Sequence, residues 1–453
     1  MIDYKAISCH SFWRFDASKN ERNVCMQNHG NLKSIDWFLA PIMEALKGAS
    51  HTRDCQKLSD LNFIQYCIMK VIMEGKSGRD FVQKMRMTFI GCHLSVSLFF
   101  KSLASGRREL LTREVASGVR GVVDAEILQT PGSDPLQQHP ELNGFAIYAT
   151  DGHTHAASAH EPFRFGKKYP VSHIFSINLR SETAIHQTLL FPEEDKKKEH
   201  EIKALKRLDI QSLRVSEPAG TKVIHVYDPA VIDYAQWQKW KQGSGIYIIT
   251  REKSNSAFTQ MGALAYDPQD VRNNGVLSDH KMETSGGITI RRIRYCDPAT
   301  GITYSFITNE MNLPPGLVAF LYFLRWNVEK LFDEFKSALD EKKAWTGQPN
   351  GKIQQAQAMV MAHNLLLLAE HRIKAEHQIE DLKVQKKRSK ALATAKEKAE
   401  KAGRPFNPLI ETCQRATRRS MQFIRWVRHC LAPTTYLSDA IAMLRPLMIK
   451  YLI

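Results

Sequence analysis

Four polar side chains are spaced so that they share one face of the helix predicted for YFLRWNVEKLFDEFK, residues 322–336. At about 100° of rotation per residue, Tyr322, Arg325, Glu329 and Lys336 fall within a stripe about 60° wide. The apolar residues form a separate buried face, so the Glu329 carboxylate should lie at the edge of the core, flanked by two cations and a phenol. A surface helix with an i,i+4 ion pair between Arg325 and Glu329 would give the same pattern, so this face alone does not define a site.

Two aspartates directly follow apolar runs that predict buried strands. Asp151 follows FAIYAT, and Asp228 follows the β-branched run KVIHVY. An acidic residue after a strand commonly serves in a turn or a helix cap. Together with Glu329, however, these aspartates are what a metal-dependent phosphoryl-transfer site requires. Carboxylates suit Mg²⁺, and two ions about 3.5–4 Å apart can activate a hydroxyl and stabilise the leaving oxygen.

A second constellation overlaps the first aspartate. Asp151, His153 and His155 alternate along the chain, and His160 follows. Alternating histidines can bind a transition metal, and their spacing resembles the opening of several metallohydrolase sites. No later histidine cluster stands at a predicted strand end. We therefore expect His153 and His155 to line a carboxylate–Mg²⁺ site or to be ordinary loop residues.

The elements that must position these residues follow from periodicity and turn signals. Apolar residues at helical spacing predict a basic helical region before a Pro- and Gly-rich linker at 129–142. An amphipathic helix is expected over 193–208, a long helix from after the 313–316 breaker to about Asp340 and another over about 353–373. Strands are predicted at 144–150, 173–179, 188–191, 222–227, 245–250, 287–295 and 302–308.

Composition and charge restrict the class of protein. The chain has 453 residues, of which 63 are Lys or Arg and 47 are Asp or Glu, and its net charge is +16. Such an excess implies a polyanionic partner, either nucleic acid or an anionic membrane surface. No apolar run approaches the roughly 18 residues of a membrane span, and the first residues lack a signal-peptide pattern. The eight cysteines form no CxxC pair, so a reducing cytosol fits best.

The spaced residues Tyr322-x2-Arg325-x3-Glu329-x6-Lys336 resemble the Y-R-E-K signature of bacterial insertion-sequence transposases, the DDE group of the "insertion sequence four" type. Trp326, the Thr308-Asn309 strand end and the order Asp, Asp, long insertion, Glu also match that family. Asp151-Gly152 resembles its first Asp-Gly, and Asp228 its second Asp. One departure is the Asp228-Pro229-Ala230 sequence, followed by Asp233-Tyr234. It keeps Asp233 as an alternative, although Asp228 directly ends the strand run.

The resemblance, which covers about residues 140–370, implies an RNase H-like α/β fold and a catalytic triad of Asp151, Asp228 and Glu329. These carboxylates would bind Mg²⁺, with Mn²⁺ as a possible substitute. Tyr322, Arg325 and Lys336 would hold the DNA backbone, and Trp326 could stack on an unpaired base. The implied partners are double-stranded DNA, as transposon terminal inverted repeats and as target, and a second copy of the chain in a homodimeric complex. The implied location is the bacterial cytosol, associated with the nucleoid.

The expected organisation has three parts. Residues 1–140 form a basic helical DNA-binding region with its linker, 141–370 form the catalytic domain with a β-rich insertion at about 237–312, and 371–453 form a basic helical region. The basic stretch 415–428 is expected to contribute to recognition of the DNA ends. The function expected is cut-and-paste transposition by DNA strand cleavage and strand transfer. The alternatives are a DNA-binding relative that has lost catalysis and a metallohydrolase that uses the histidines.

Overall fold

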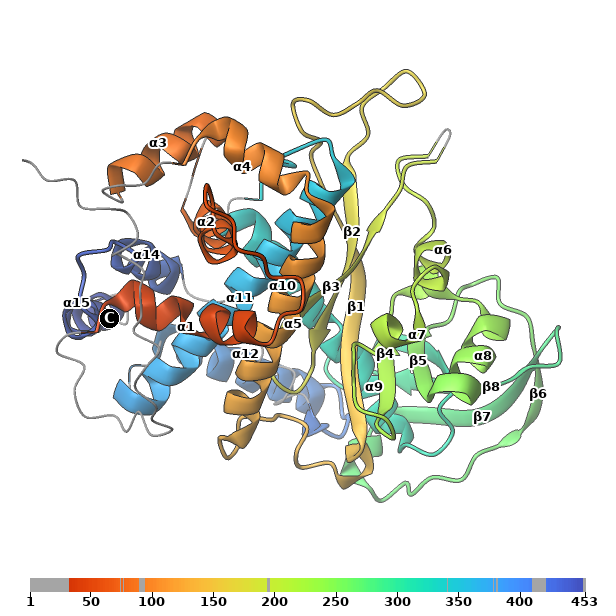
Figure 1. Cartoon of the computed structure of the whole chain (residues 1–453). Coiled ribbons are helices and arrows are strands. Elements are labelled where there is room, and N and C mark those ends of the chain that lie inside the picture. The colour runs from red at the N-terminus through yellow and green to blue at the C-terminus, as the bar shows by residue number, and fades with distance from the viewer. Residues whose placement is uncertain are drawn as a thin grey trace, which may run out of the picture.

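The computed structural model describes residues 32–73, 75, 77–88, 94–193, 196–339, 341–377, 379, 382–409 and 421–450 (Figure 1). Several predicted features lie outside the described residues. They are the first 31 residues, the expected helix end at Asp340 and the part of the basic stretch 415–428 that precedes Met421.

One mixed sheet of nine strands organises the molecule, in the order β3-β2-β1-β4-β5-β9-β8-β7-β6. The first three strands along the chain are antiparallel neighbours, whereas β4 and β5 run parallel to β1. The remaining strands extend the sheet from β5 as an antiparallel group. The strands are β1 (Phe145–His155), β2 (Val171–Asn178), β3 (Ala184–Leu190), β4 (Lys222–Val226), β5 (Ile246–Arg251), β6 (Phe258–Ala263), β7 (Val276–Thr284), β8 (Thr289–Cys296) and β9 (Thr303–Thr308).

Helices cover both faces of the first five strands (Figure 1). On one face, apolar residues of α5 and α11 share a hydrophobic cluster with Ile147 and Ala149 of β1. On the other face, Tyr148 packs in a second cluster with Leu205 of α6 and Trp237 of α8. Because side chains alternate along a strand, β1 contributes to both cores. The helices are α5 (Gly106–Gln129), α9 (Pro315–Leu324), α10 (Trp326–Ser337) and α11 (Pro349–His377) on the first face and α6 (Glu201–Lys206), α7 (Ile210–Leu213) and α8 (Tyr234–Ser244) on the second.

This arrangement confirms the predicted α/β fold, a mixed sheet with helices on both faces. The added antiparallel strands β6 to β9 span 258–308. The insertion expected at about 237–312 therefore also takes in most of α8 and all of β5, although β5 pairs in parallel with β4. Short 3₁₀ turns connect the elements at η2 (Pro140–Leu142), η3 (Pro229–Val231) and η4 (Val271–Asn273).

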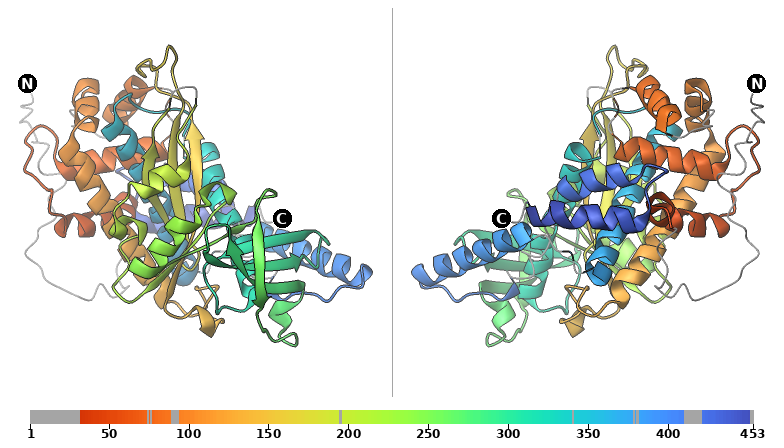
Figure 2. Two further views of the ribbon diagram at one scale, coloured as in Figure 1. Left: turned by 90° about the vertical axis from the view of Figure 1, so that its right-hand side faces the viewer. Right: turned by 90° about the vertical axis from the view of Figure 1, so that its left-hand side faces the viewer.

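The N-terminal helices, α14 and α15 pack into the same hydrophobic core as one face of the sheet. A seam joins the segments before α1 and α15: Ser34 N donates to Thr435 O at 3.0 Å and Leu437 N to Leu32 O at 2.8 Å. Figure 2 shows α1 beside α14 and α15. The helices are α1 (Ser34–Lys47), α2 (Asp60–Ile72), α3 (Gly78–Thr88), α4 (Val96–Leu103), α12 (Leu382–Lys401), α14 (Met421–Cys430) and α15 (Leu437–Lys450).

The helix expected from after Gly316 to about Asp340 is divided at Arg325 into α9 and α10. Around this residue the backbone bonds span three residues: Arg325 N donates to Tyr322 O at 3.1 Å and Val328 N to Arg325 O at 3.0 Å. Such tightening locally changes the rotation per residue, so the four polar residues do not follow one regular helix face.

No helix in the described ranges is both long and apolar enough to cross a membrane.

Candidate active site

The register of the sheet places Asp151 and Asp228 side by side. Ala149 of β1 pairs with Val226, the last residue of the parallel strand β4. Each aspartate stands two residues beyond this pair. Because neighbouring parallel strands keep the same spacing, both carboxylates emerge at the same level of the sheet. The prediction had ended the first strand before Asp151, but β1 continues to His155 because β2 remains paired with it.

A third carboxylate, which was not predicted from the sequence, joins these two. One oxygen each of Asp151, Glu201 and Asp228 lies within 4.8 Å of the others, close enough for one metal ion to contact all three. Glu201 begins α6, which packs on the sheet through Ala204 and Leu205. A glutamate in the first turn of an amphipathic helix is ordinarily explained by the helix dipole. In the sequence, the one indication that Glu201 could belong to the site was therefore its place in the chain between the two strands that carry Asp151 and Asp228.

The charges of this cluster are only partly balanced. Burial raises the pKa of Asp151 to about 6, and the charge of Asp228 and, more weakly, that of Glu201 act in the same direction, against Arg325. Asp151 Oδ1 accepts a hydrogen bond from Gly152 N at 2.7 Å, and Asp228 Oδ1 accepts one from Ala230 N at 2.8 Å. Carboxylates held together in this way favour either a shared proton or a bound cation.

Arg325 links the cluster to the predicted third catalytic residue. Its Nη1 donates to Asp151 Oδ2 at 2.8 Å and its Nη2 to Glu329 Oε1 at 3.0 Å. The Glu329 side chain is 37% exposed, whereas Arg325 as a residue is only 8% exposed. Among the described residues, Glu329 does not belong to the group of carboxylates within metal-sharing distance. The i,i+4 pair is thus present, but the same guanidinium also bonds a strand residue 174 positions away.

The other residues of the predicted signature differ in exposure. Tyr322 is buried against Phe306, with ring centroids 4.9 Å apart, and the Arg325 guanidinium lies 5.8 Å from the Tyr322 ring. Trp326 is 55% exposed and its ring is also 5.8 Å from that guanidinium. Lys336 is exposed on α10. Arg325 is therefore surrounded by two aromatic rings and two carboxylates.

The alternative aspartate, Asp233, has other partners. Its Oδ1 accepts from Gln236 N at 3.0 Å, which caps α8, and its Oδ2 accepts from Lys206 Nζ at 2.5 Å. Among the described residues, the group of carboxylates close enough to share one metal ion contains Asp228 and not Asp233. These contacts explain Asp233 as a helix cap.

The alternating histidines are buried in the sheet core. His153 hydrogen-bonds Glu341 and its ring stacks on Phe332 with centroids 4.5 Å apart. His155 stacks on His173, and burial lowers the pKa values of both. The cluster of potential metal ligands found among the described residues contains no histidine. His153 and His155 therefore act as packed strand residues rather than as loop residues.

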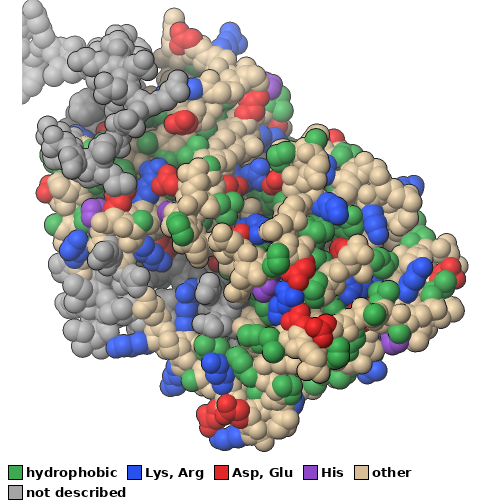
Figure 3. All heavy atoms as spheres, turned by 90° about the horizontal axis from the view of Figure 1, so that it is seen from below, with side chains coloured by type: hydrophobic (Ala, Val, Ile, Leu, Met, Phe, Trp, Pro, Cys, Tyr) green, Lys and Arg blue, Asp and Glu red, His purple; other side chains and the backbone are tan. Residues whose placement is uncertain are grey.

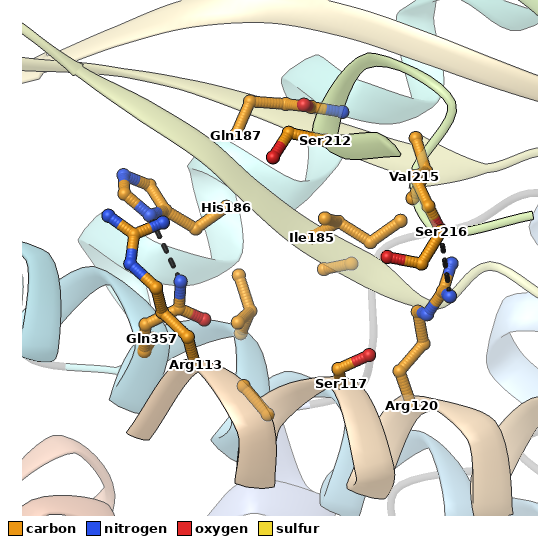
Figure 4. Close-up of a pocket in the computed structure, with 13 residues that line it drawn as sticks. Arg113, Ser117, Arg120, Ile185, His186, Gln187, Ser212, Val215, Ser216 and Gln357 are labelled. Carbon is orange, nitrogen blue, oxygen red and sulfur yellow. Dashed lines mark hydrogen bonds between the residues drawn. The ribbon is translucent and has the colours of Figure 1, made fainter. Parts of the chain in front are cut away.

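A separate pocket of about 180 Å³ lies beside the edge strand β3. Figure 4 shows Arg113, Arg120 and Gln357 facing it from α5 and α11 and His186 from β3. Gln357 hydrogen-bonds His186 at 3.2 Å, and Arg120 donates to Val215 O at 3.0 Å. None of the three clustered carboxylates lines this pocket.

Basic side chains are widely distributed. On the face seen from below, Lys and Arg are interspersed with acidic residues (Figure 3). Some basic residues of the N-terminal helices serve structure: Arg107 Nη2 lies 2.7 Å from Asp60 Oδ1, and the buried Arg108 donates to Leu58 O at 2.5 Å. These two cations are therefore engaged in contacts within the protein.

A family model described as a transposase DDE domain matches residues 118–365, more than half of the chain. The match begins inside α5 and ends inside α11, and it includes Asp151, Glu201, Asp228 and Glu329. No curated protein matches the chain. The chain belongs to the family of transposases with a DDE domain.

Proposed function

We propose that this protein binds the terminal inverted repeats of a mobile DNA element and performs divalent-metal-dependent strand cleavage and strand transfer, as transposases of the "insertion sequence four" type do. The observation that carries the proposal is the meeting of Asp151 and Asp228 at one level of the sheet, within a matched transposase domain. The net charge of +16 supports a large polyanion as the partner.

The donor set fits Mg²⁺ or Mn²⁺. Asp151 and Asp228 offer carboxylate oxygens, which hard divalent cations prefer. The raised pKa of Asp151 reflects burial beside other negative charges, and a cation would offset that cost. When bound, such an ion would activate the attacking hydroxyl and stabilise the leaving oxygen of the phosphodiester.

We infer that Glu329 completes the catalytic triad when DNA is bound. In the free protein, Arg325 bonds both Asp151 and Glu329. A DNA phosphate offers the guanidinium a bidentate acceptor, which would free Glu329 to approach the aspartates. The partial exposure of Glu329 leaves room for that movement.

Arg325 has one further feature that favours a phosphate partner. Its Nε–H is buried and has no acceptor among the described residues. A buried donor without an acceptor is costly, and a phosphate oxygen would satisfy it. Lys336 would add a point charge beside the same backbone, Tyr322 a hydrogen bond and the exposed Trp326 a stacking surface for an unpaired base. The active complex would contain two copies of the chain, in the bacterial cytosol and associated with the nucleoid.

The test uses purified full-length protein and a DNA fragment that carries the inverted repeats found beside the gene. Wild-type protein should shift this DNA in a gel and nick it at the element ends with Mg²⁺ but not with EDTA. Asp151→Asn should bind the DNA equally and fail to cut it, because the substitution removes a metal ligand and leaves the basic surface intact. Asp233→Asn is the matched control and should still cut.

Two outcomes would contradict this function. Binding of end DNA without cleavage by wild-type protein, under all divalent metals tried, would favour a DNA-binding relative that has lost catalysis. Zinc-dependent hydrolysis of free phosphomonoesters would favour the histidine-based metallohydrolase.

A further inference from the structure

We propose that Glu201 is a ligand of the divalent ion held by Asp151 and Asp228, so that the free protein binds metal through these three carboxylates. The inference rests on the proposed function and extends its metal site to a residue outside the predicted triad. It assigns to α6 a part in chemistry that the signature helix alone would not suggest.

The first observation is that Glu201 reaches the aspartates from the opposite face of the sheet. Arg325 contacts Asp151 from the side of α9 and α10, whereas α6 packs on the face that contains Tyr148. The Glu201 side chain is nevertheless within 4.8 Å of both aspartates through one oxygen of each. Glu201 as a residue is only 8% exposed, so its carboxylate is directed into the protein and not toward bulk water.

The second observation is the space that Gly152 leaves. Alternation along β1 turns position 152 to the face opposite Asp151, toward α6. A Cβ atom added there would overlap the Glu201 carboxylate and approach Lys198 Nζ to 3.1 Å. The backbone at Gly152 does not require glycine for its conformation, since its φ is not positive. A side chain at this position would therefore require the Glu201 carboxylate to shift away from the strand beside Asp151.

The third observation concerns how Glu201 is balanced without metal. Lys198 Nζ lies 2.6 Å from Glu201 Oε1, and the Lys198 side chain is 36% exposed. A flexible, well-hydrated ammonium can return to water when a divalent ion takes its place. Lys198 thus serves as the counter-cation of Glu201 in the free protein.

The backbone beside Glu201 is held firmly. Glu199 Oε1 accepts from Phe191 N at 2.8 Å and from Arg207 Nη2 at 2.8 Å, which ties the start of α6 to its end and to the strand region. Leu205 anchors the helix in the core. A ligand fixed by such contacts needs little reorganisation to receive an ion.

The test measures Mn²⁺ binding to the full-length protein without DNA, by isothermal calorimetry and by the electron paramagnetic resonance signal of free Mn²⁺. Glu201→Gln should weaken Mn²⁺ binding at least about 10-fold, since the loss of outer-sphere groups alone can have that effect. Gly152→Ala should weaken it as well, because the new methyl group displaces the Glu201 carboxylate. Glu193→Gln is the control. Glu193 also pairs with a lysine, Lys203 at 2.7 Å, and the substitution removes the same charge at a position away from the cluster.

The outcomes separate this inference from the proposed function. Equal Mn²⁺ affinity in wild type and Glu201→Gln, with binding lost in Asp151→Asn, would overturn the role of Glu201 and leave the metal site intact. Mn²⁺ affinity unchanged by Asp151→Asn would overturn the proposed metal site itself. If Glu201→Gln does not fold, as judged by circular dichroism, Glu201→Asp keeps the charge, shortens the side chain and should still weaken binding.

Discussion

Two groups of carboxylates, one buried and one partly buried, lie along the same sheet and differ in how their charge is neutralised. In the β6–β9 part, Asp279 bonds Arg291 through both oxygens, at 2.9 and 2.5 Å, and Glu310 lies 3.7 Å from the same guanidinium. Glu310 also accepts from Asn312 N and Leu313 N. All three charged side chains are almost completely buried.

The group at Asp151, Glu201 and Asp228 has weaker compensation. Arg325 is shared with Glu329 outside the group, and Lys198 is partly exposed. The comparison teaches that burial and negative charge alone do not identify a metal site. The group whose cation is a buried, bidentate arginine is structural, and the group whose cations are shared or hydrated can accept an external ion.

The largest effect is expected from Asp228→Asn. Removing one of the two strand carboxylates should lower cleavage of end DNA about 1000-fold or more, because several kcal/mol of transition-state stabilisation are lost with the metal. In EDTA, its free energy of unfolding should equal or exceed that of wild type, since like-charge repulsion is relieved. Single-turnover cleavage and urea unfolding provide the two measurements.

The buried group of Asp279, Arg291 and Glu310 should respond to substitution in the opposite way. Asp279→Asn leaves a buried guanidinium without its main partner and should destabilise the protein by roughly 3–5 kcal/mol. Glu283→Gln on the same strand is the control and should change stability by less than about 0.5 kcal/mol, since Glu283 is only half-buried. Similar urea midpoints for Asp279→Asn and Asp228→Asn would remove the distinction between the two groups.

Arg325→Ala tests the residue that connects Asp151 of the carboxylate group to Glu329 outside it. If Arg325 clamps a phosphate, the variant should cleave end DNA about 100-fold more slowly, as expected for loss of a transition-state charge contact. The salt dependence of binding should become shallower by about one phosphate contact. Lys336→Ala should produce the same change in salt dependence. Cleavage by the folded fraction at the wild-type rate would assign Arg325 a structural role.

The smallest effect concerns pH and the first half of the sheet. Burial lowers the pKa of His225 in β4 to about 4, from an ordinary value of 6.5. Between these values the unfolded chain binds a proton that the folded chain does not, so stability falls as pH decreases from about 6.5 to 4. We expect His225 to contribute a loss of about 1 kcal/mol between pH 7.5 and 5.5, measured by urea unfolding.

His225→Gln should make that pH dependence shallower. His280, the histidine of the β6–β9 segment, is only half-buried, so His280→Gln serves as the control and should leave the dependence as in wild type. An unchanged slope in His225→Gln would show that His225 does not contribute to the pH dependence.

The strands that carry apolar, β-branched runs could be predicted because their own sequences favour burial. The run 222–227 became β4, and 245–250 became β5 within one residue at each end. In contrast, β6 and β7 were missed because neither contains a continuous β-branched run: β6 is mostly exposed, and β7 mixes buried and exposed positions. They form strands by pairing with each other and with β8.

Part of the candidate site could be predicted from the sequence for the same reason. Asp151 and Asp228 follow strong strand signals, so their meeting could be expected. The Arg325–Asp151 bond and the approach of Glu201 depend on how α6 and α10 pack on opposite faces of β1. Local periodicity carries no information about such contacts between distant segments.

The seam between the two ends of the described chain has a consequence for biosynthesis. Ser34 bonds Thr435, and Lys33 Nζ donates to Pro433 O at 2.8 Å, across about 400 residues. Contacts so distant in sequence close slowly, and a ribosome releases the N-terminal partner long before the C-terminal one exists. During translation, α1 therefore lacks its C-terminal contacts until the end of the chain has been synthesised. A prematurely terminated chain would leave exposed the apolar surface that α14 and α15 cover.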